Sequence, residues 1–211
     1  MHPLIEQTVE ALRSAGWQVE AAPAKLPMPP HIIDRYPGLP PLAVEFFTSL
    51  SRCESAGGGS WLLTAADYAA PAHPDGHAWD SFEDLSNAGS DAAARAFWDR
   101  HLILFQLVSG DYEFLALCLD RSSPNFGKVV GTDLLAFEEA EPLAESYEDF
   151  LIQLREIARR PPTRSAVYDN YLTLFVHEQI IEDGSTPPWE QGVLGKLRRL
   201  LRGGRRSAGG A

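Results

Sequence analysis

Metal binding is the strongest catalytic possibility that the sequence offers. His73 and His77 flank Asp75 in a His-Pro-Asp-Gly-His segment, and Asp80 follows three residues later. Imidazole and carboxylate groups are ligands that zinc accepts. The segment is rich in proline and glycine, so no helix face holds these side chains at a fixed spacing. We therefore expect no metal site, and a metal-dependent enzyme is the least favoured hypothesis.

A second metalloenzyme motif is incomplete. His177-Glu178 begins like the His-Glu-x-x-His motif of zinc proteases, in which two histidines one helical turn apart hold the metal. Position 181 is Ile181, so the second histidine is missing. The sequence also lacks a phosphate-binding loop, the nucleophile elbow of hydrolases and the glycine spacing of a dinucleotide fold. It therefore predicts no catalytic residue and no cofactor.

The cysteines and most aromatic residues fit a packed interior better than a reactive site. Cys53 and Cys118 lie in apolar surroundings without a nearby histidine, and we expect buried, unreactive thiols. His101 begins an apolar run, where a structural histidine is the simpler interpretation. Four aromatic residues could line a ligand pocket but are more simply core residues: Trp61, Trp98, Phe105 and Tyr112. Trp79 differs, because a tryptophan in a polar segment can anchor a protein partner.

Composition predicts a folded, soluble chain. The 211 residues are 45% hydrophobic and 22% charged, which is typical of globular proteins. A chain of this length buries enough surface to fold without a disulfide or a metal. Its first residues lack the basic start and apolar run of a signal peptide, and no apolar run is long enough to span a membrane. We therefore expect a cytoplasmic protein without stable membrane insertion.

The net charge of −11 is unevenly distributed. Two stretches contain seven acidic residues each and no lysine or arginine, one between Arg52 and Arg95 and one between Lys128 and Arg155. An acidic body repels nucleic acid, which we do not expect as a partner, and attracts basic proteins. The stretches are either solvated segments that keep the chain soluble or a binding surface for a cationic partner.

Hydrophobic spacing and turn residues predict alternating helices and strands. The strongest signal is a pair of apolar runs, 101–108 and 112–119, around Ser109-Gly110-Asp111, which predicts two paired antiparallel strands inside a sheet. Ser146 and Asp149 resemble a capping box at the start of a helix. Further strands are expected at 17–20, 61–63 and 128–132, and helices at 3–15, 32–36, 41–50, 91–99, 147–160 and around 168–176.

The order of these elements has a counterpart in a known family. Residues 31–158 contain a short helix before Leu39-Pro40, a second helix with Phe46-Phe47, a strand with Trp61, the apolar hairpin with Gly110-Asp111 and a closing helix introduced by Ser146. This order resembles the SUKH superfamily, which includes a fungal cell-wall assembly regulator and many bacterial immunity proteins.

The resemblance implies an α+β fold with a central, mostly antiparallel sheet and helices packed around it. It also implies a protein without enzymatic activity that binds other proteins. In bacterial relatives the partner is typically a toxin, often a nuclease, which is neutralised inside the producing cell. A strongly acidic chain suits a cationic toxin. The alternative is a regulatory or scaffold protein of the same fold that binds a cellular protein.

The partner is expected to bind a surface built from the acidic segment 64–91 and the acidic residues that follow the strand at 128–132. If charge reversal in the first segment has no effect, the site is expected among the acidic residues from Asp133 to Glu145. Five residues of the first segment are the candidate contacts: Asp75, Trp79, Asp80, Glu83 and Asp84. Four parts are expected along the chain: an N-terminal helix and proline-rich connector (1–30), a SUKH-like α+β domain (31–160), a C-terminal helical extension (161–189) and a basic amphipathic helix with a disordered tail (190–211). The sequence does not specify an oligomeric state.

Overall fold

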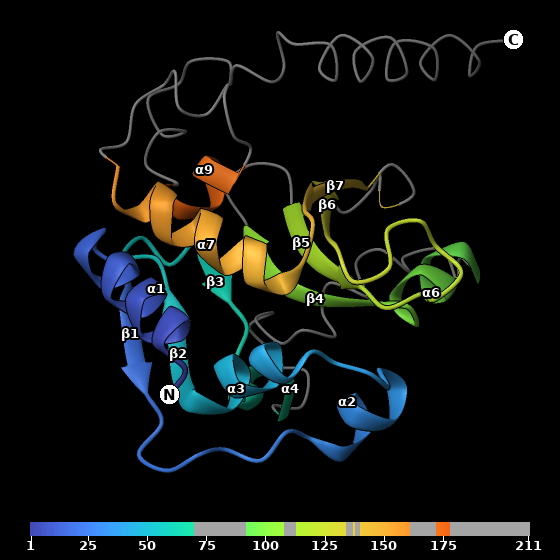
Figure 1. Cartoon of the computed structure of the whole chain (residues 1–211), viewed down its shortest axis with the longest axis horizontal. Helices are drawn as coiled ribbons and strands as arrows, with labels where there is room; N and C mark the ends of the chain where they lie inside the picture. Colours follow the sequence, from blue (N-terminus) through green and yellow to red (C-terminus); the bar gives the residue numbers. More distant parts are fainter. Residues whose placement is uncertain (70–91, 108–112, 134–136, 138–139, 161–171, 178–211) are drawn as a thin grey trace, which may run out of the picture.

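Helices pack around a seven-stranded sheet in the computed structural model, which describes residues 1–69, 92–107, 113–133, 137, 140–160 and 172–177 (Figure 1). The strands are β1 (Gln18–Ala21), β2 (Leu50–Glu54), β3 (Ser60–Leu62), β4 (His101–Leu107), β5 (Glu113–Cys118), β6 (Val129–Asp133) and β7 (Glu141–Ala144). The described helices are α1 (Pro3–Ser14), α2 (Pro30–Arg35), α3 (Pro41–Ser49), α4 (Ala65–Ala69), α6 (Ala92–Trp98), α7 (Tyr147–Ala158) and α9 (Leu172–Val176).

The strands lie in the sheet in the same order as in the sequence, from β1 to β7. Each strand pairs with the next in antiparallel orientation. Pairing between consecutive strands needs only short connections, since antiparallel neighbours run back along one another. The α+β class with an antiparallel sheet, predicted from the sequence, is therefore confirmed.

The predicted central strand pair is also confirmed. Leu102 of β4 lies opposite Leu117 of β5, and Gln106 lies opposite Phe114. Nearly every residue of both strands is buried, which explains why their sequence does not alternate between apolar and polar residues. The turn around Gly110 lies outside the described residues.

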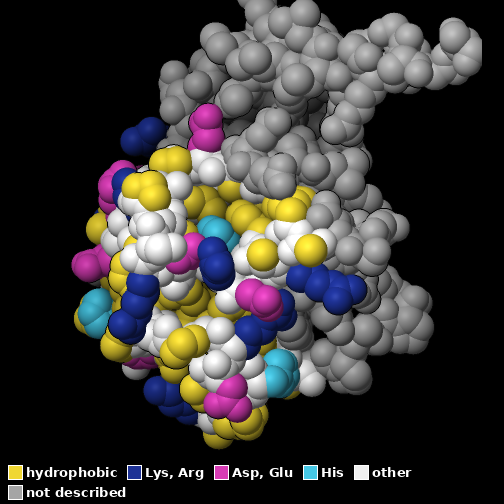
Figure 2. All heavy atoms as spheres, turned by 90° about the vertical axis from the view of Figure 1, so that its right-hand side faces the viewer, with side chains coloured by type: hydrophobic (Ala, Val, Ile, Leu, Met, Phe, Trp, Pro, Cys, Tyr) yellow, Lys and Arg dark blue, Asp and Glu magenta, His cyan; other side chains and the backbone are white. Residues whose placement is uncertain are grey.

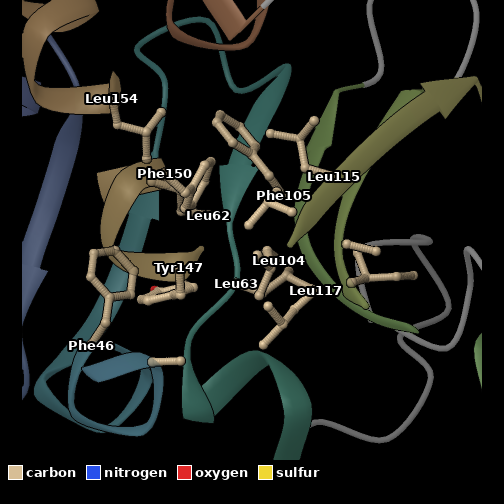
Figure 3. Packing of buried hydrophobic residues seen from close by; sticks show 14 of the residues in the cluster. Phe46, Leu62, Leu63, Leu104, Phe105, Leu115, Leu117, Tyr147, Phe150 and Leu154 are labelled. Carbon is tan, nitrogen blue, oxygen red and sulfur yellow. The ribbon is translucent and has the colours of Figure 1, made fainter. Parts of the chain in front are cut away.

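One face of the sheet packs against α7. Ser146 begins this helix, because its Oγ accepts a hydrogen bond from the amide of Asp149 at 3.0 Å. The Asp149 carboxylate in turn accepts from the amide of Glu145, also at 3.0 Å, so the predicted cap is present with a reciprocal bond one residue earlier than usual. Figure 3 shows Phe150 and Leu154 of α7 facing the side chains of the central strands.

The N-terminal residues belong to the same core. Thr8 of α1 donates a hydrogen bond through Oγ1 to the carbonyl of Leu151 in α7, at 3.2 Å. The indole of Trp17 donates to the carbonyl of Val176 in α9, at 3.0 Å. Residues 1–30, grouped in the sequence as a helix and connector, thus contribute a helix, an edge strand and buried side chains to the sheet and its covering layer.

Three elements were not predicted. Strand β2 begins at Leu50, directly after α3 ends at Ser49, so no turn residue marks the change from helix to strand. Strand β7 contains Pro142, a residue that argues against a strand except at an edge. Helix α4 lies in the segment 64–91, which was expected to be a loop. Of the two predicted C-terminal parts, the structure describes only residues 172–177, and residues 178–211 lie outside it.

Both edges of the sheet are obstructed by side chains. At β1, Arg13 donates from Nε and Nη2 to the carbonyl of Val19, at 3.1 and 2.9 Å. At β7, Pro142 has no amide hydrogen, and Gln153 of α7 donates to the carbonyl of Leu143 at 3.2 Å. Because unpaired strand edges are templates for association, these contacts disfavour pairing with another chain.

Replacing Arg13 with alanine is expected to expose the edge of β1. Loss of the two hydrogen bonds from a charged donor should lower the free energy of unfolding by about 1–2 kcal/mol. It should also produce concentration-dependent self-association in sedimentation velocity, because the Val19 carbonyl becomes available. Arg159→Ala is the control, since Arg159 is exposed at the end of α7 and touches neither edge. An Arg13→Ala variant with unchanged stability and no new self-association would contradict this role.

Candidate protein-binding surface

The contact residues predicted from the sequence lie outside the described residues. They are Asp75, Trp79, Asp80, Glu83 and Asp84, all within residues 70–91. The structure does describe the two helices that flank this segment, α4 before it and α6 after it. Together these two helices determine where the acidic segment joins the body of the protein, and α6 begins directly after it at Ala92.

Helix α6 is fixed to the sheet by aromatic rings. The ring of Trp98 is fully buried and lies edge-on to Phe114, with centroids 4.8 Å apart. Phe97 also packs edge-on against the ring of Phe114, with centroids 5.8 Å apart. Phe114 and its neighbour Leu115 point to opposite faces of β5, so α6 covers the face opposite α7. Trp98 and Phe105 are core residues, as predicted, whereas Trp61 is only half-buried and Tyr112 lies outside the described residues.

The second acidic stretch reaches the same helix. Phe137 lies in the middle of the stretch between Lys128 and Arg155, and its ring is 5.3 Å from that of Phe97. The contact of Phe137 therefore joins the second acidic stretch to α6. The first stretch is connected to the described body at α4 and at α6, which precede and follow residues 70–91.

Some acidic residues of the second stretch make contacts within the protein and are less available to a partner. Glu145 pairs with Lys128, whose Nζ lies 2.8 Å from its carboxylate. Asp149 is used in the cap of α7. Glu141 and Glu148 are exposed, and neither has an ion pair among the residues that the structure describes. The charge that this stretch offers to a partner is therefore smaller than its seven acidic residues suggest.

Arginines gather on the neighbouring surface, which is formed by α2, the end of α6 and the β5–β6 loop (residues 119–128). Arg35 of α2 pairs with Asp99 at 3.0 Å, and Arg100 pairs with Asp120 of the loop, also at 3.0 Å. Tyr36 donates a hydrogen bond to the carbonyl of Trp98 at 2.7 Å. Figure 2 looks onto this end of the molecule and shows basic and acidic side chains interspersed over the described face.

The β5–β6 loop has a fixed shape. The Asp120 carboxylate accepts hydrogen bonds from the amide and the hydroxyl of Ser122, at 2.9 and 2.6 Å. These bonds, together with Arg100, hold the pKa of Asp120 below its usual value. The amide of Phe126 donates to the carbonyl of Ser123 at 3.1 Å. Gly127 then turns the chain back into β6 with a φ of +81°, a backbone conformation that favours glycine.

Comparison of the chain with protein-family models, with curated proteins and with solved structures found no match. The resemblance to the SUKH superfamily therefore stays a prediction.

The described histidines of interest make structural contacts. Nδ1 of His101 lies 2.8 Å from the carbonyl of Phe97, and the imidazole stacks on the Phe97 ring at 3.9 Å. Nε2 of His177 lies 3.2 Å from the carbonyl of Ile157. Burial lowers the pKa of both imidazoles and so favours their neutral form. These contacts fit the structural role expected for His101.

Chemistry based on cysteine or metal has little support in the described part of the chain. Cys53 and Cys118 are buried free thiols, as predicted, and burial raises the pKa of Cys53. Among the described residues, no three His, Cys, Asp or Glu side chains come together as a metal site would require. His73 and His77 lie outside them. Of the described helices, none is both long enough and apolar enough to cross a membrane.

Sequence reasoning missed two residues of this end. Phe137 lies in an acidic stretch and Phe126 lies in a turn, and neither was predicted to be a core or contact residue. The signal that singled out Trp79, an aromatic residue among polar ones, applies to Phe126, whereas Leu134, Leu135 and Ala136 precede Phe137. The fold also distinguishes the two residues, because Phe137 is buried against α6 whereas Phe126 is 47% exposed.

Proposed function

We propose that this chain is a protein-binding protein of the immunity type, which neutralises a toxin with a cationic surface, such as a nuclease, by binding to it. The observation that supports the proposal most is the contact of Phe137 with Phe97, which joins the second acidic stretch to the helix that follows the acidic segment 70–91. We expect a partner that docks at this end of the molecule to meet negative charge from both stretches. Such a surface accelerates the capture of a basic protein, because long-range attraction steers the encounter.

The scaffold behind this surface suits binding by a preformed body. Helix α6 is held by the buried ring of Trp98, and the contact of Phe97 with Phe137 joins it to the chain between β6 and β7. Two ion pairs and the hydrogen bond of Tyr36 connect α2, α6 and the β5–β6 loop. A rigid surface loses little conformational entropy on association, which leaves more of the contact energy for affinity.

Charge reversal of the acidic segment tests the proposal. The partner is first purified from cells of the source organism with the tagged full chain and identified by mass spectrometry. With the Asp80→Lys, Glu83→Lys, Asp84→Lys variant, the association rate constant measured by surface plasmon resonance should fall about tenfold or more at low salt. The dependence of this rate on salt should also become flatter, because fewer opposite charges attract the partner at long range.

A matched control separates a local effect from one of net charge. The Glu6→Lys, Glu10→Lys, Glu20→Lys variant changes the charge by the same amount, at exposed positions on α1 and β1. Figure 1 shows these elements at the opposite side of the sheet from α6. Equal loss of association rate in both variants, or in neither, would contradict an acidic docking surface at α6. A stable complex with a resident cellular protein instead of a toxin would favour the regulatory alternative.

A further inference from the structure

We infer that the β5–β6 loop is the contact anchor of the complex, with Phe126 entering an apolar recess of the partner and Arg121 pairing with a carboxylate at the border of that recess. The inference rests on the proposed function, because it assigns the contact residues of the same end of the molecule. It adds a short-range, apolar and directional contact to the long-range attraction of the acidic stretches.

The loop is ordered before any partner arrives. In addition to the bonds of Asp120 and Phe126, the amide of Gly127 donates to the carbonyl of Cys118 at 2.8 Å. The amide of Asn125 donates to Oγ of Ser123 at 3.1 Å. A loop held in this way presents its exposed side chains at fixed positions, so binding requires little further loss of backbone conformational entropy.

Phe126 is the exposed aromatic side chain of this surface in the described part of the chain. Four large hydrophobic side chains are exposed in the described part of the chain: Met1, Ile33, Phe126 and Ile152. Phe126 is the aromatic one among them, and it stands on the ordered loop. Buried aromatic anchors near charged residues are typical of the contacts that contribute most to protein–protein affinity.

Arg121 offers hydrogen-bond donors that the described residues do not use. Arg35 and Arg100 on the same surface are each paired with an aspartate, at 3.0 Å. Arg121 is exposed and has neither an ion pair nor a hydrogen bond within the described residues. Its Nη2 lies against the turn at Gly38, 3.7 Å from where a Cβ would be. A guanidinium in this position can bind a carboxylate through two parallel hydrogen bonds.

The position of the loop connects this anchor to the acidic stretches. Arg100 follows α6 closely in the sequence, and its ion pair with Asp120 joins the end of that helix to the loop. A partner at α6 therefore lies within reach of Phe126 and Arg121. The partner chemistry that fits is a mainly basic protein surface with an apolar recess and a carboxylate beside it. Nucleic acid fits poorly, since the chain carries a net charge of −11.

Photo-crosslinking from two positions tests the inference. The full chain carries benzoylphenylalanine in place of Phe126 in one sample and in place of Ile152 in the other, and both are irradiated in cells of the source organism. Ile152 is the matched control, because it is a large hydrophobic residue that is 37% exposed on α7. We expect position 126, and not position 152, to capture one protein. An excess of unlabelled wild-type chain should compete with the capture, and Phe126→Ala should not.

Affinity measurements with the purified captured protein complete the test. We expect Phe126→Ala to weaken binding by at least about 30-fold and Arg121→Ala by about tenfold, with Arg121→Lys recovering only part of the loss. Ile152→Ala should bind like the wild type. Thermal unfolding of each variant shows whether the fold is intact, and we expect little change because both loop side chains are exposed.

The outcomes separate the inference from the proposed function. If the acidic triple variant loses binding while Phe126→Ala and Arg121→Ala bind like the wild type, the loop is not the anchor and the proposed function stands. Equal capture from positions 126 and 152 would also overturn the inference. If neither labelled chain captures a protein and the wild-type chain co-purifies with none, both the inference and the proposed function fail.

Discussion

Replacing Phe105 with alanine should lower the free energy of unfolding by about 3–5 kcal/mol, because the substitution removes a large, fully buried side chain. Phe105 lies in the central strand β4 and is fully buried. Its ring packs edge-on against Trp17, at 5.5 Å, and against Phe175, at 4.9 Å. Truncation leaves a cavity where the first and the last described parts of the chain meet, so the loss of contacts combines with the cost of the cavity.

Chemical denaturation followed by tryptophan fluorescence measures this effect. Leu117→Ala in β5 should cost about 2–5 kcal/mol for the same reason, since Leu117 is also fully buried. The more conservative Phe105→Leu should cost clearly less than Phe105→Ala, because it leaves a smaller cavity. Ile152→Ala is the surface control and should change stability by less than about 0.5 kcal/mol. A Phe105→Ala variant as stable as this control would contradict the packing of β4 under α7 and α9.

Adding a single methyl group at Gly131 should destabilise the protein by about 1–3 kcal/mol. Gly131 lies in β6, opposite Leu115 of β5. A Cβ at this position would lie 2.6 Å from Leu115 Cδ2, 2.8 Å from Leu143 Cδ1 and 3.0 Å from the carbonyl oxygen of Phe114. The two leucines can move to other rotamers, whereas the carbonyl belongs to the sheet. Gly131→Ala therefore strains β5 and β6 at the point where they pair.

A double variant tests the cause of this strain. Leu143→Ala removes one of the two crowding side chains, and Leu143 is only half-buried, so the single substitution should cost little. In the background of Leu143→Ala, the cost of Gly131→Ala should fall, which appears as a favourable coupling energy in a double-mutant cycle of denaturant unfolding. Additive effects of the two substitutions would show that the methyl group does not meet Leu143.

Several elements could be predicted because their signals act over a few residues. Ser146 and Asp149 lie three residues apart, which is the spacing of the hydrogen bond that begins α7. Pro41 opens α3 because proline is compatible with the first turn of a helix. The apolar runs of β4 and β5 are close together in the sequence, so their pairing needs only a short turn. In each case the residues that carry the signal also make the contact.

Other features depend on contacts between distant residues. The strand β2 has no turn residue before it, and its conformation is stabilised by pairing with β1, where Val19 lies opposite Cys53. The edge strand β7 forms despite Pro142, because its pairing partner β6 and the side chain of Gln153 both reach it. A prediction made from a short stretch of sequence does not include these distant pairing partners. It therefore assigns no strand at β2 or at β7.

The composition, the acidic stretches, the central strand pair and the Ser146 cap of α7 were determined by the sequence alone. The tertiary structure decided that the second acidic stretch reaches α6, through the contact of Phe137 with Phe97. It also decided that Phe126 is exposed on an ordered loop while Phe137 is buried. Local signals specify hydrogen bonds between near neighbours. Which side chains meet across the sheet follows only when all seven strands have paired and the helices have covered their faces.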